Sequence, residues 1–395
     1  MLDFGKLLAQ IEAIDRESLL DRKDWQETLA KGQAAFAEAA ASGDEFAQKL
    51  LRNSQTVLWP VATPLSPIGQ KITVCACDDA YTVVAADGSQ IMPSHHEVHT
   101  CYLLNIGIAA ITYGGRTAPV LESIPFLYSR PDDLYPLVDR RRFHIDELYV
   151  SMERTILEIE TLADKALLMK STGVAVLALY DGSLIPWSVE KLSDGYQNRY
   201  VERLSAALER LQQQAIPLVG YLSQSRSADL VNCLRIWQCP YPSSNCRLHC
   251  DHLNEDDFPC SEIWPASDRQ LLREHLQPAD CSAIFLSGAG VSRFFGKEDR
   301  ICFSYLNVGE EIARLEFPRW VYDDELLASA LSMVLSQTKK GLGYPVSLAE
   351  AHHLAVIRGA DRDQFFDLMT RQLLALGVSG LRTSIKEAKK RNTFV

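Results

Sequence analysis

Long apolar stretches are absent from this chain of 395 residues. It has no run of about 18 uninterrupted apolar residues, so nothing in it indicates a membrane-spanning helix. The opening residues, Met1 to Lys6, lack the basic and apolar regions of a secretion signal. Ten cysteines in such a chain predict reduced thiols rather than a disulfide framework. We therefore expect a cytoplasmic protein without a membrane partner.

Basic residues are outnumbered by acidic ones, 40 against 51, which gives a net charge of −11. This balance argues against a general basic surface for nucleic acid. It leaves room for DNA in a locally basic channel, because binding depends on where the cations lie. The candidate phosphate contacts are Arg140–Arg142, Arg226 and the C-terminal stretch Lys386–Arg391, and the two basic clusters could equally be solvated surface.

Two familiar phosphate motifs are also missing. The chain shows neither a Walker-type lysine loop nor a phosphatase-type pair of aspartates. A phosphatase or nucleotide hydrolase therefore has little support from the sequence.

The tripeptide Asp-Gly-Ser occurs twice, each time after an apolar run rich in strand-forming residues. Asp87 follows the run 81–86, and Asp181 follows the run 174–180. Such runs predict buried strands, and ligands gather at the carboxyl ends of strands in open α/β sheets. Two ordinary turns after strands would give the same tripeptide. Two strand-end carboxylates, however, are suitable ligands for a divalent cation, which prefers oxygen.

The order of apolar runs and breakers predicts an α/β fold. Residues 1–70 form an N-terminal segment, helical to about residue 55, and residues 71–395 form the main domain, with a Cys-rich insertion at about 233–265. Strands are expected at 71–86, 99–111, 118–126, 174–180, 216–222, 282–286, 301–308 and 312–317, and helices at 146–170, 198–214, 323–339, 347–358 and 361–376. This order resembles an RNase H-like mixed sheet flanked by helices rather than a TIM barrel.

A third carboxylate is expected from the helix at 146–170. Its apolar face comprises Met152, Ile156, Ile159, Ala163 and Ala166. Glu153 and Glu160 lie at the edge of that face, whereas Glu158 is expected to point to solvent. We select Glu160, because it is nearer the strand that carries Asp181, with Glu153 as the second choice. Two aspartates and a glutamate are an arrangement for two-metal phosphoryl chemistry, in which Asp87 would bridge the ions.

Histidines offer further ligands or proton donors. His352 lies in a predicted helix that opens with Ser347 and Glu350, the spacing of a capping box. It could also be a structural or surface residue. The triplet His95, His96 and His99 has a metal-like spacing but no common face.

The Cys-rich insertion lacks the paired Cys-x-x-Cys units of common zinc sites. Cys239, Cys246, Cys250 and Cys260 could hold a structural zinc ion, with His249 and His252 as alternates. An iron–sulfur cluster or four free thiols are the other possibilities.

Five stretches, in this order, resemble the NurA nuclease family, especially cyanobacterial-type NurA-domain proteins. They are Val83–Gln90, Tyr180–Ile185, Gly220–Arg226, Ala313–Pro318 and Gly343–His352. The resemblance runs from about residue 80 to the end of the chain. It implies an RNase H-like core and a manganese-dependent (or magnesium-dependent) DNA nuclease with a two-ion site. It also implies a toroidal homodimer that docks on a HerA-type hexameric translocase in DNA end resection and double-strand break repair.

The family's activities are 5′–3′ exonuclease and single-strand endonuclease cleavage. The family's metal ligands match Asp87, Asp181 and a helical glutamate, here Glu160. Its Tyr–His pair, eight residues apart, matches Tyr344 and His352. The resemblance thus predicts catalytic roles for these five residues and metal ligation by His352 as well as by the three carboxylates. A non-catalytic DNA-binding or scaffold partner of a DNA motor is the alternative function.

Overall fold

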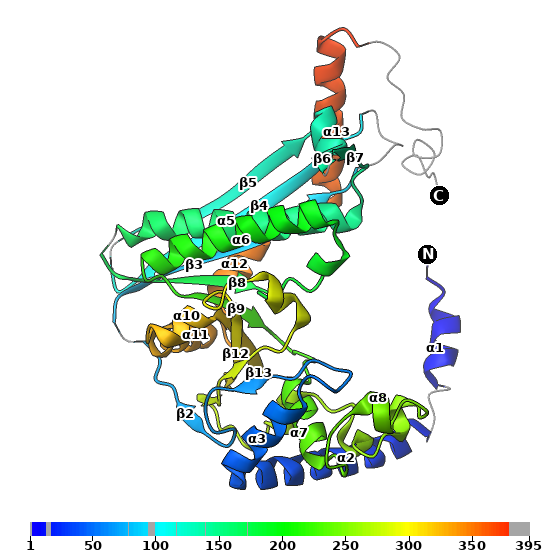
Figure 1. Cartoon of the computed structure of the whole chain (residues 1–395). Coiled ribbons are helices and arrows are strands. Elements are labelled where there is room, and N and C mark those ends of the chain that lie inside the picture. The colour runs from blue at the N-terminus through cyan, green and yellow to red at the C-terminus, as the bar shows by residue number, and fades with distance from the viewer. Residues whose placement is uncertain are drawn as a thin grey trace. The chain divides into compact units, whose positions relative to one another are not determined.

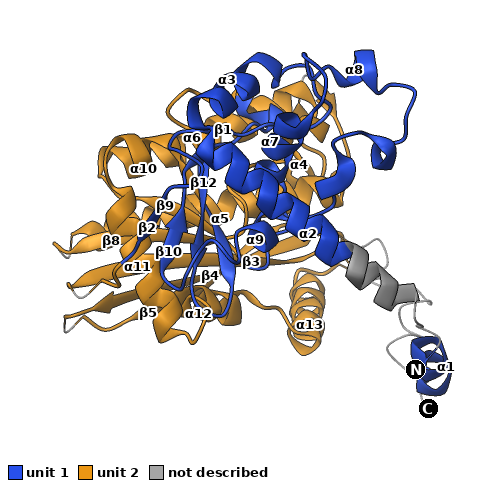
Figure 2. Ribbon diagram, turned by 90° about the horizontal axis from the view of Figure 1, so that it is seen from below, with its two compact units in different colours: residues 1–74, 223–292, 302–315 blue, residues 75–222, 293–301, 316–395 orange. Residues whose placement is uncertain are grey.

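The computed structural model describes residues 2–12, 17–77, 79–93, 99–115, 117–138, 140–171 and 173–378, apart from the side chains of 17–24 (Figure 1). His95, His96 and the basic stretch 386–391 lie outside the described residues. The chain divides into two compact units (Figure 2). The first comprises residues 1–74, 223–292 and 302–315, and the second comprises residues 75–222, 293–301 and 316–395.

The second unit is built on a mixed sheet with the strand order β5-β4-β3-β8-β9. The strands are β3 (Tyr81–Ile91), β4 (Tyr102–Tyr113), β5 (Val120–Tyr128), β8 (Ala175–Asp181) and β9 (Leu218–Leu222). The first three form an antiparallel meander, and β8 and β9 run parallel to β3. This arrangement confirms the predicted α/β class and the RNase H-like sheet flanked by helices.

The helices of the second unit include α5 (Glu147–Lys170), α6 (Asp194–Gln213), α11 (Leu327–Lys340), α12 (Val346–Ala355) and α13 (Gly359–Ala375). Helices α5 and α12 pack directly on the sheet, and α6 packs on α5. The predicted apolar face of α5 is buried at all five positions. Asp146 caps this helix, because its side chain accepts a hydrogen bond from the Tyr149 backbone nitrogen at 2.8 Å. The helix therefore begins where the sequence predicted.

The start of α12 differs from the prediction. The helix begins at Val346 with Pro345 as its N-cap, and the expected capping box of Ser347 and Glu350 is wrong. Ser347 is instead fully buried, and its backbone nitrogen donates to the Gln337 side chain of α11 at 3.2 Å. A proline can start a helix without a side-chain cap. Its ring fixes φ, and the N–H that it lacks would have no intrahelical partner at a helix start.

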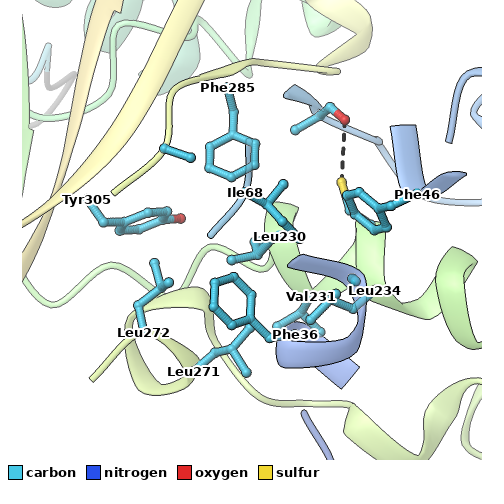
Figure 3. Close-up of a cluster of buried hydrophobic side chains, with 14 of the residues drawn as sticks. Phe36, Phe46, Ile68, Leu230, Val231, Leu234, Leu271, Leu272, Phe285 and Tyr305 are labelled. Carbon is cyan, nitrogen blue, oxygen red and sulfur yellow. Dashed lines mark hydrogen bonds between the residues drawn. The ribbon is translucent and has the colours of Figure 1, made fainter. Parts of the chain in front are cut away.

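The first unit contains the N-terminal helices α1 (Phe4–Glu12), α2 (Glu17–Ala41) and α3 (Gly43–Asn53). Its short strands are β1 (Thr63–Pro64), β2 (Lys71–Thr73), β10 (Asp280–Ser282), β11 (Phe285–Leu286), most of β12 (Ile301–Asn307) and the start of β13 (Ile312–Pro318). Helix α7 (Asp229–Gln238) completes a core in which Phe36, Phe46, Leu230 and Phe285 are buried (Figure 3). This packing joins the N-terminal helices to residues near 230 and 285 that are distant in sequence.

Each unit also contains shorter helices or strands. They are α4 (Pro131–Leu134), β6 (Leu137–Val138), β7 (Arg141–Arg142), α8 (Cys246–His249), α9 (Asp268–Leu271) and α10 (Arg319–Asp323). Among the described residues, no helix is both long enough and apolar enough to cross a membrane.

Candidate active site

The two aspartates of the repeated tripeptide stand beside each other in the sheet of the second unit. Strands β3 and β8 are parallel neighbours, and their last registered pair is Ala86 with Tyr180. Asp87 and Asp181 are each the next residue along. Residues opposite one another in neighbouring parallel strands point to the same face of the sheet. The two carboxylates are therefore brought together by strand register.

The glycines of the two tripeptides serve different purposes. Gly182 has a φ of +132°, a conformation that side chains disfavour, and it lets the chain turn away from the end of β8. Gly88 is needed for space. A Cβ atom there would overlap the Glu158 carboxylate oxygen Oε1 and lie 3.0 Å from Arg154 Cγ on α5. Gly182 thus allows a turn, and Gly88 leaves space for side chains of helix α5.

Helix α12 brings His352 to Asp87. The strand partner of Asp87 is Gly107 on β4, and a Cβ at Gly107 would collide with the α12 backbone at Ala351 and Ala355. The end of α12 is tied to the sheet by the Asn105 amide, which donates to the Ala355 carbonyl at 2.9 Å. His352 Nδ1 lies 2.7 Å from Asp87 Oδ2, and the His352 side chain is 59% exposed.

Tyr344 makes the corresponding contact with the second aspartate. Its hydroxyl donates to Asp181 Oδ2 at 2.8 Å, and its ring meets Tyr221 of β9 edge-on. Burial raises the pKa of Asp181, the Tyr344 hydrogen bond opposes that rise, and the Asp87 charge adds to it. Asp87 is thus close enough to disfavour ionisation of Asp181.

The loop after Asp181 is held by a buried glutamate. Glu316 on β13 is 1% exposed. Its Oε2 accepts hydrogen bonds from the Ser183 hydroxyl at 2.8 Å and from the Leu184 backbone nitrogen at 2.9 Å. This glutamate belongs to the Ala313–Pro318 stretch, and nothing in the sequence pattern indicated that it supports the second tripeptide.

The helical carboxylate that reaches the aspartates is Glu158, although the helical period predicts that this side chain points to solvent. That expectation is wrong, because Glu158 is 3% exposed and lies against Gly88. Tyr180 donates to Glu158 Oε2 at 2.9 Å, and Arg154 Nε lies 3.2 Å from Oε1. Burial raises the pKa of Glu158 to about 7, with further contributions in that direction from Asp87 and Asp181.

The structure places the predicted Glu160 elsewhere. Both of its carboxylate oxygens accept hydrogen bonds from Arg203 on α6, at 2.8 and 2.6 Å. Arg203 also binds Glu153 at 2.8 Å. The two glutamates at the edge of the apolar face thus meet the neighbouring helix, whereas Glu158 lies on the sheet side.

The donors at this site suit a hard divalent cation. Asp87, Asp181 and Glu158 supply carboxylate oxygens, and His352 supplies a ring nitrogen. The charges of Asp87 and Asp181 contribute to the raised pKa of Glu158, and a cation bound beside them would oppose this effect. Within the described residues, no three His, Cys, Asp or Glu side chains already form a group arranged to hold a metal ion. Metal binding would therefore draw these carboxylates together.

The predicted strand-end position is correct for Asp181, the last residue of β8, and wrong for Asp87, because β3 continues to Ile91. The fold and the site define a class of protein: an RNase H-like α/β domain with acidic residues side by side on its central parallel strands. The sequence profile of the NurA domain family matches residues 81–357, and the chain belongs to this family. Membership indicates a nuclease, a hydrolase of nucleic acid.

Two solved structures are similar to the chain. The NurA nuclease from Sulfolobus solfataricus is 15% identical over 78% of this chain and 88% of its own, with a TM-score of 0.44. LC9-RNase H1, a type 1 RNase H with the type 2 active-site motif, is 14% identical over 39% of this chain and 68% of its own, with a TM-score of 0.20. No curated protein matches the chain.

Proposed function

We propose that the chain is a metal-dependent deoxyribonuclease whose metal ligands are Asp87, Asp181 and Glu158. The observation that carries this proposal is the register of β3 and β8, which pairs the two aspartates, together with the approach of Glu158 through the space left by Gly88. Family membership supports the same conclusion. Glu158 replaces Glu160 in the ligand set, because Arg203 already occupies the Glu160 carboxylate.

Divalent ions at this site, Mn²⁺ or Mg²⁺, would supply an activated water and neutralise charge on the scissile phosphate. Asp87, placed between Asp181 and His352, is the carboxylate suited to bridge two ions. Asp181 holds the second position, with Tyr344 orienting its Oδ2. The short side-chain contacts on both aspartates fix their rotamers, which reduces the reorganisation needed when the substrate arrives.

His352 is placed for proton transfer. Nδ1 of His352 lies 2.7 Å from Asp87 Oδ2, so Nε2 is the ring nitrogen left for the substrate or a metal ion. The ring is more than half exposed, which leaves Nε2 accessible to substrate. A protonated His352 would give its proton to the leaving 3′ oxygen. Direct ligation of a metal by Nε2 is the other role this geometry permits.

A groove beside the Asp181 loop supports a nucleic acid substrate. It is lined by residues of α5 and by the segment after β8, including Thr155, Ser183 and Trp187. Trp187 is 50% exposed. An exposed indole is a platform on which a base of single-stranded DNA can stack, at about 1–3 kcal/mol per base. A DNA strand stacked on Trp187 would therefore approach the site from the side of the second tripeptide.

The assembly is proposed from the resemblance of the sequence to NurA proteins. We propose that the chain works as a homodimer with a HerA-type translocase in DNA end resection and double-strand break repair. Cleavage is expected to proceed 5′ to 3′ at ends and within single strands. A locally basic lining in such a dimer would reconcile DNA binding with a net charge of −11.

The test compares two matched glutamine substitutions on one helix. Glu158→Gln and Glu160→Gln each remove one negative charge and keep the side-chain shape. We expect Glu158→Gln to lower manganese-dependent cleavage of single-stranded DNA by about a hundredfold or more, because an orienting ligand is lost. Glu160→Gln should keep activity within a few fold. A larger loss of cleavage in Glu160→Gln than in Glu158→Gln would instead assign the metal ligand to Glu160.

The aspartates provide the broader test of nuclease function. Asp87→Asn and Asp181→Asn should abolish cleavage in manganese and in magnesium, and EDTA should abolish it in the unmodified chain. Circular dichroism and size-exclusion chromatography should show an unchanged fold and oligomeric state. Full activity in either variant, or activity that persists in EDTA, would refute a metal nuclease at this site. Inactivity of the unmodified chain with either metal, together with DNA binding, would favour the scaffold function.

A further inference from the structure

Four cysteines of the first unit line one narrow cavity. They are Cys239, Cys246, Cys250 and Cys260. They come from the C-cap of α7, the first residue and C-cap of α8, and the residue before the short helix Ser261–Ile263. All four are free thiols, and all except Cys239 are buried. Cysteines spread over 22 positions of the sequence thus line one cavity.

The cysteines belong to one compact buried segment. Cys250 and Cys260 pack together with Phe258, and the Cys250 backbone nitrogen donates to the Cys246 carbonyl at 2.8 Å. Thiolates that repel one another in a buried space are stabilised by a bound cation, as in structural metal sites. The histidines that the sequence offered as alternates, His249 and His252, are not among the residues that line the cavity. The donor set is therefore four sulfurs.

A buried arginine faces the same cavity. Arg235 is 1% exposed, and its guanidinium lies 3.7 Å from the ring of Trp59 and 5.1 Å from that of Trp264. Its Nη1 lies 3.2 Å from Glu255, while Nε and Nη2 are buried without a hydrogen-bond partner in the described part of the chain. Arg235 and Cys260 line the same cavity. A buried guanidinium with spare donors suits a site that carries negative charge.

We propose that Cys239, Cys246, Cys250 and Cys260 form a site for a thiolate-bound metal centre. Its residues are different from those of the carboxylate site. The cavity measures about 10 Å³, roughly the space of one water-sized sphere, which suits a single Zn²⁺ ion. An iron–sulfur cluster uses the same four-cysteine chemistry and would need the cavity to widen. Each thiol that binds releases its proton to solvent. The resulting negative charge of the centre is balanced by Arg235.

The centre would stabilise a segment with little core of its own. The buried apolar cluster beside it consists of Cys250, Phe258 and Cys260, with Trp59, Tyr241 and Leu253 packed around them. As they stand, the cysteines are not arranged to hold an ion. Zinc–sulfur bonds of about 2.3 Å would draw the four sulfurs inward. The ion would then tie the end of α7 to α8 and to the residues after it.

The experiment measures metal in the full-length protein, purified without chelators and under exclusion of oxygen. Zinc, iron and acid-labile sulfide are determined per chain, and a second sample is reconstituted with zinc sulfate or with iron and sulfide. About one zinc per chain supports a single ion, and about four iron atoms and four sulfides support a cluster. The absence of a stoichiometric metal before and after reconstitution would overturn the proposal.

Serine substitutions locate the metal. Cys250→Ser and Cys260→Ser should each reduce the bound metal from about one equivalent to a small fraction, because a structural site needs all its thiolates. Cys281→Ser is the matched control, since Cys281 is buried in the same unit beside Ser304 but lies outside the cavity. Metal retained in full by both site variants would also overturn the proposal. If a site variant fails to fold, the metal content of the unmodified chain decides.

Discussion

The substitution Gly88→Ala tests the active-site geometry most sharply, because it changes no charge and removes no ligand. A methyl group at Gly88 would overlap Glu158 Oε1 and would lie 3.0 Å from both Glu158 Cδ and Arg154 Cγ. Ordinary contacts of a Cβ atom are 3.4–4 Å. The carboxylate must therefore retreat on the order of 1 Å, and a displacement of that size costs about a hundredfold in rate when it affects a catalytic group.

The expected loss of stability is small by comparison. The clashing atoms are the end of a side chain, which can move, so the cost is about that of mild overpacking, 1–3 kcal/mol. Activity should fall about a hundredfold while urea denaturation shows a folded second unit. Gly115→Ala is the matched control, because a Cβ there meets Thr112 at an ordinary 3.6 Å. It should retain full activity.

A double-substitution cycle identifies the cause. Glu158→Asp withdraws the carboxylate by about one carbon–carbon bond, which makes room for the methyl group. If the clash with Glu158 causes the loss, Gly88→Ala should cost much less in the Glu158→Asp background than in the unmodified chain. Equal losses in both backgrounds, or an unaffected Gly88→Ala enzyme, would refute the placement of Glu158 beside the first tripeptide.

Two further predictions concern protonation. Tyr344→Phe removes the hydrogen bond that opposes the raised pKa of Asp181, so the acid limb of the pH–rate profile should move to higher pH, and an unchanged limb would contradict the role of Tyr344. Burial raises the pKa of Glu158 from 4.5 to about 7, so the folded state takes up the proton more readily than the unfolded chain. This stabilisation, at most about 3 kcal/mol, is present below about pH 4.5 and is lost as the pH rises through 7. Denaturant unfolding of the metal-free protein should show this slope, and Glu158→Gln should remove it.

Much of the sheet could be predicted from local patterns. The strand runs ending at Asp87 and Asp181 are apolar and β-branched, and such runs have few alternatives to a buried strand. The face of α5 followed from its 3.6-residue period, and all five predicted apolar positions are buried. The predicted capping box at Ser347 is wrong, because the helix begins at Val346 with Pro345 as its N-cap and Ser347 is buried in the core. A cap depends on which way a side chain points, and sequence spacing does not determine that.

The choice among the glutamates of α5 shows what required tertiary structure. A helical period describes one apolar face and assigns the opposite face to solvent. Helix α5 is covered on two sides, by the sheet and by α6, so polar residues on both sides are partly or fully buried. Glu153 and Glu160 meet Arg203 on α6, and Glu158 meets the sheet at Gly88. No local signal distinguishes the two sides, because Arg203 is 43 residues from Glu160 in sequence.

The sequence by itself therefore determined the two aspartates that follow apolar strand runs, the helix between them, the Tyr344–His352 pair and the family that these residues resemble. The aspartates and the helix follow from the order and spacing of residue types along the chain, and the Tyr344–His352 pair follows from the resemblance to the family. Only the tertiary structure decided that Glu158 faces the aspartates, that Glu316 holds the second tripeptide and that four cysteines line one cavity with Arg235. These depend on which distant segments pack together, and long-range packing is set by burial and shape rather than by local spacing.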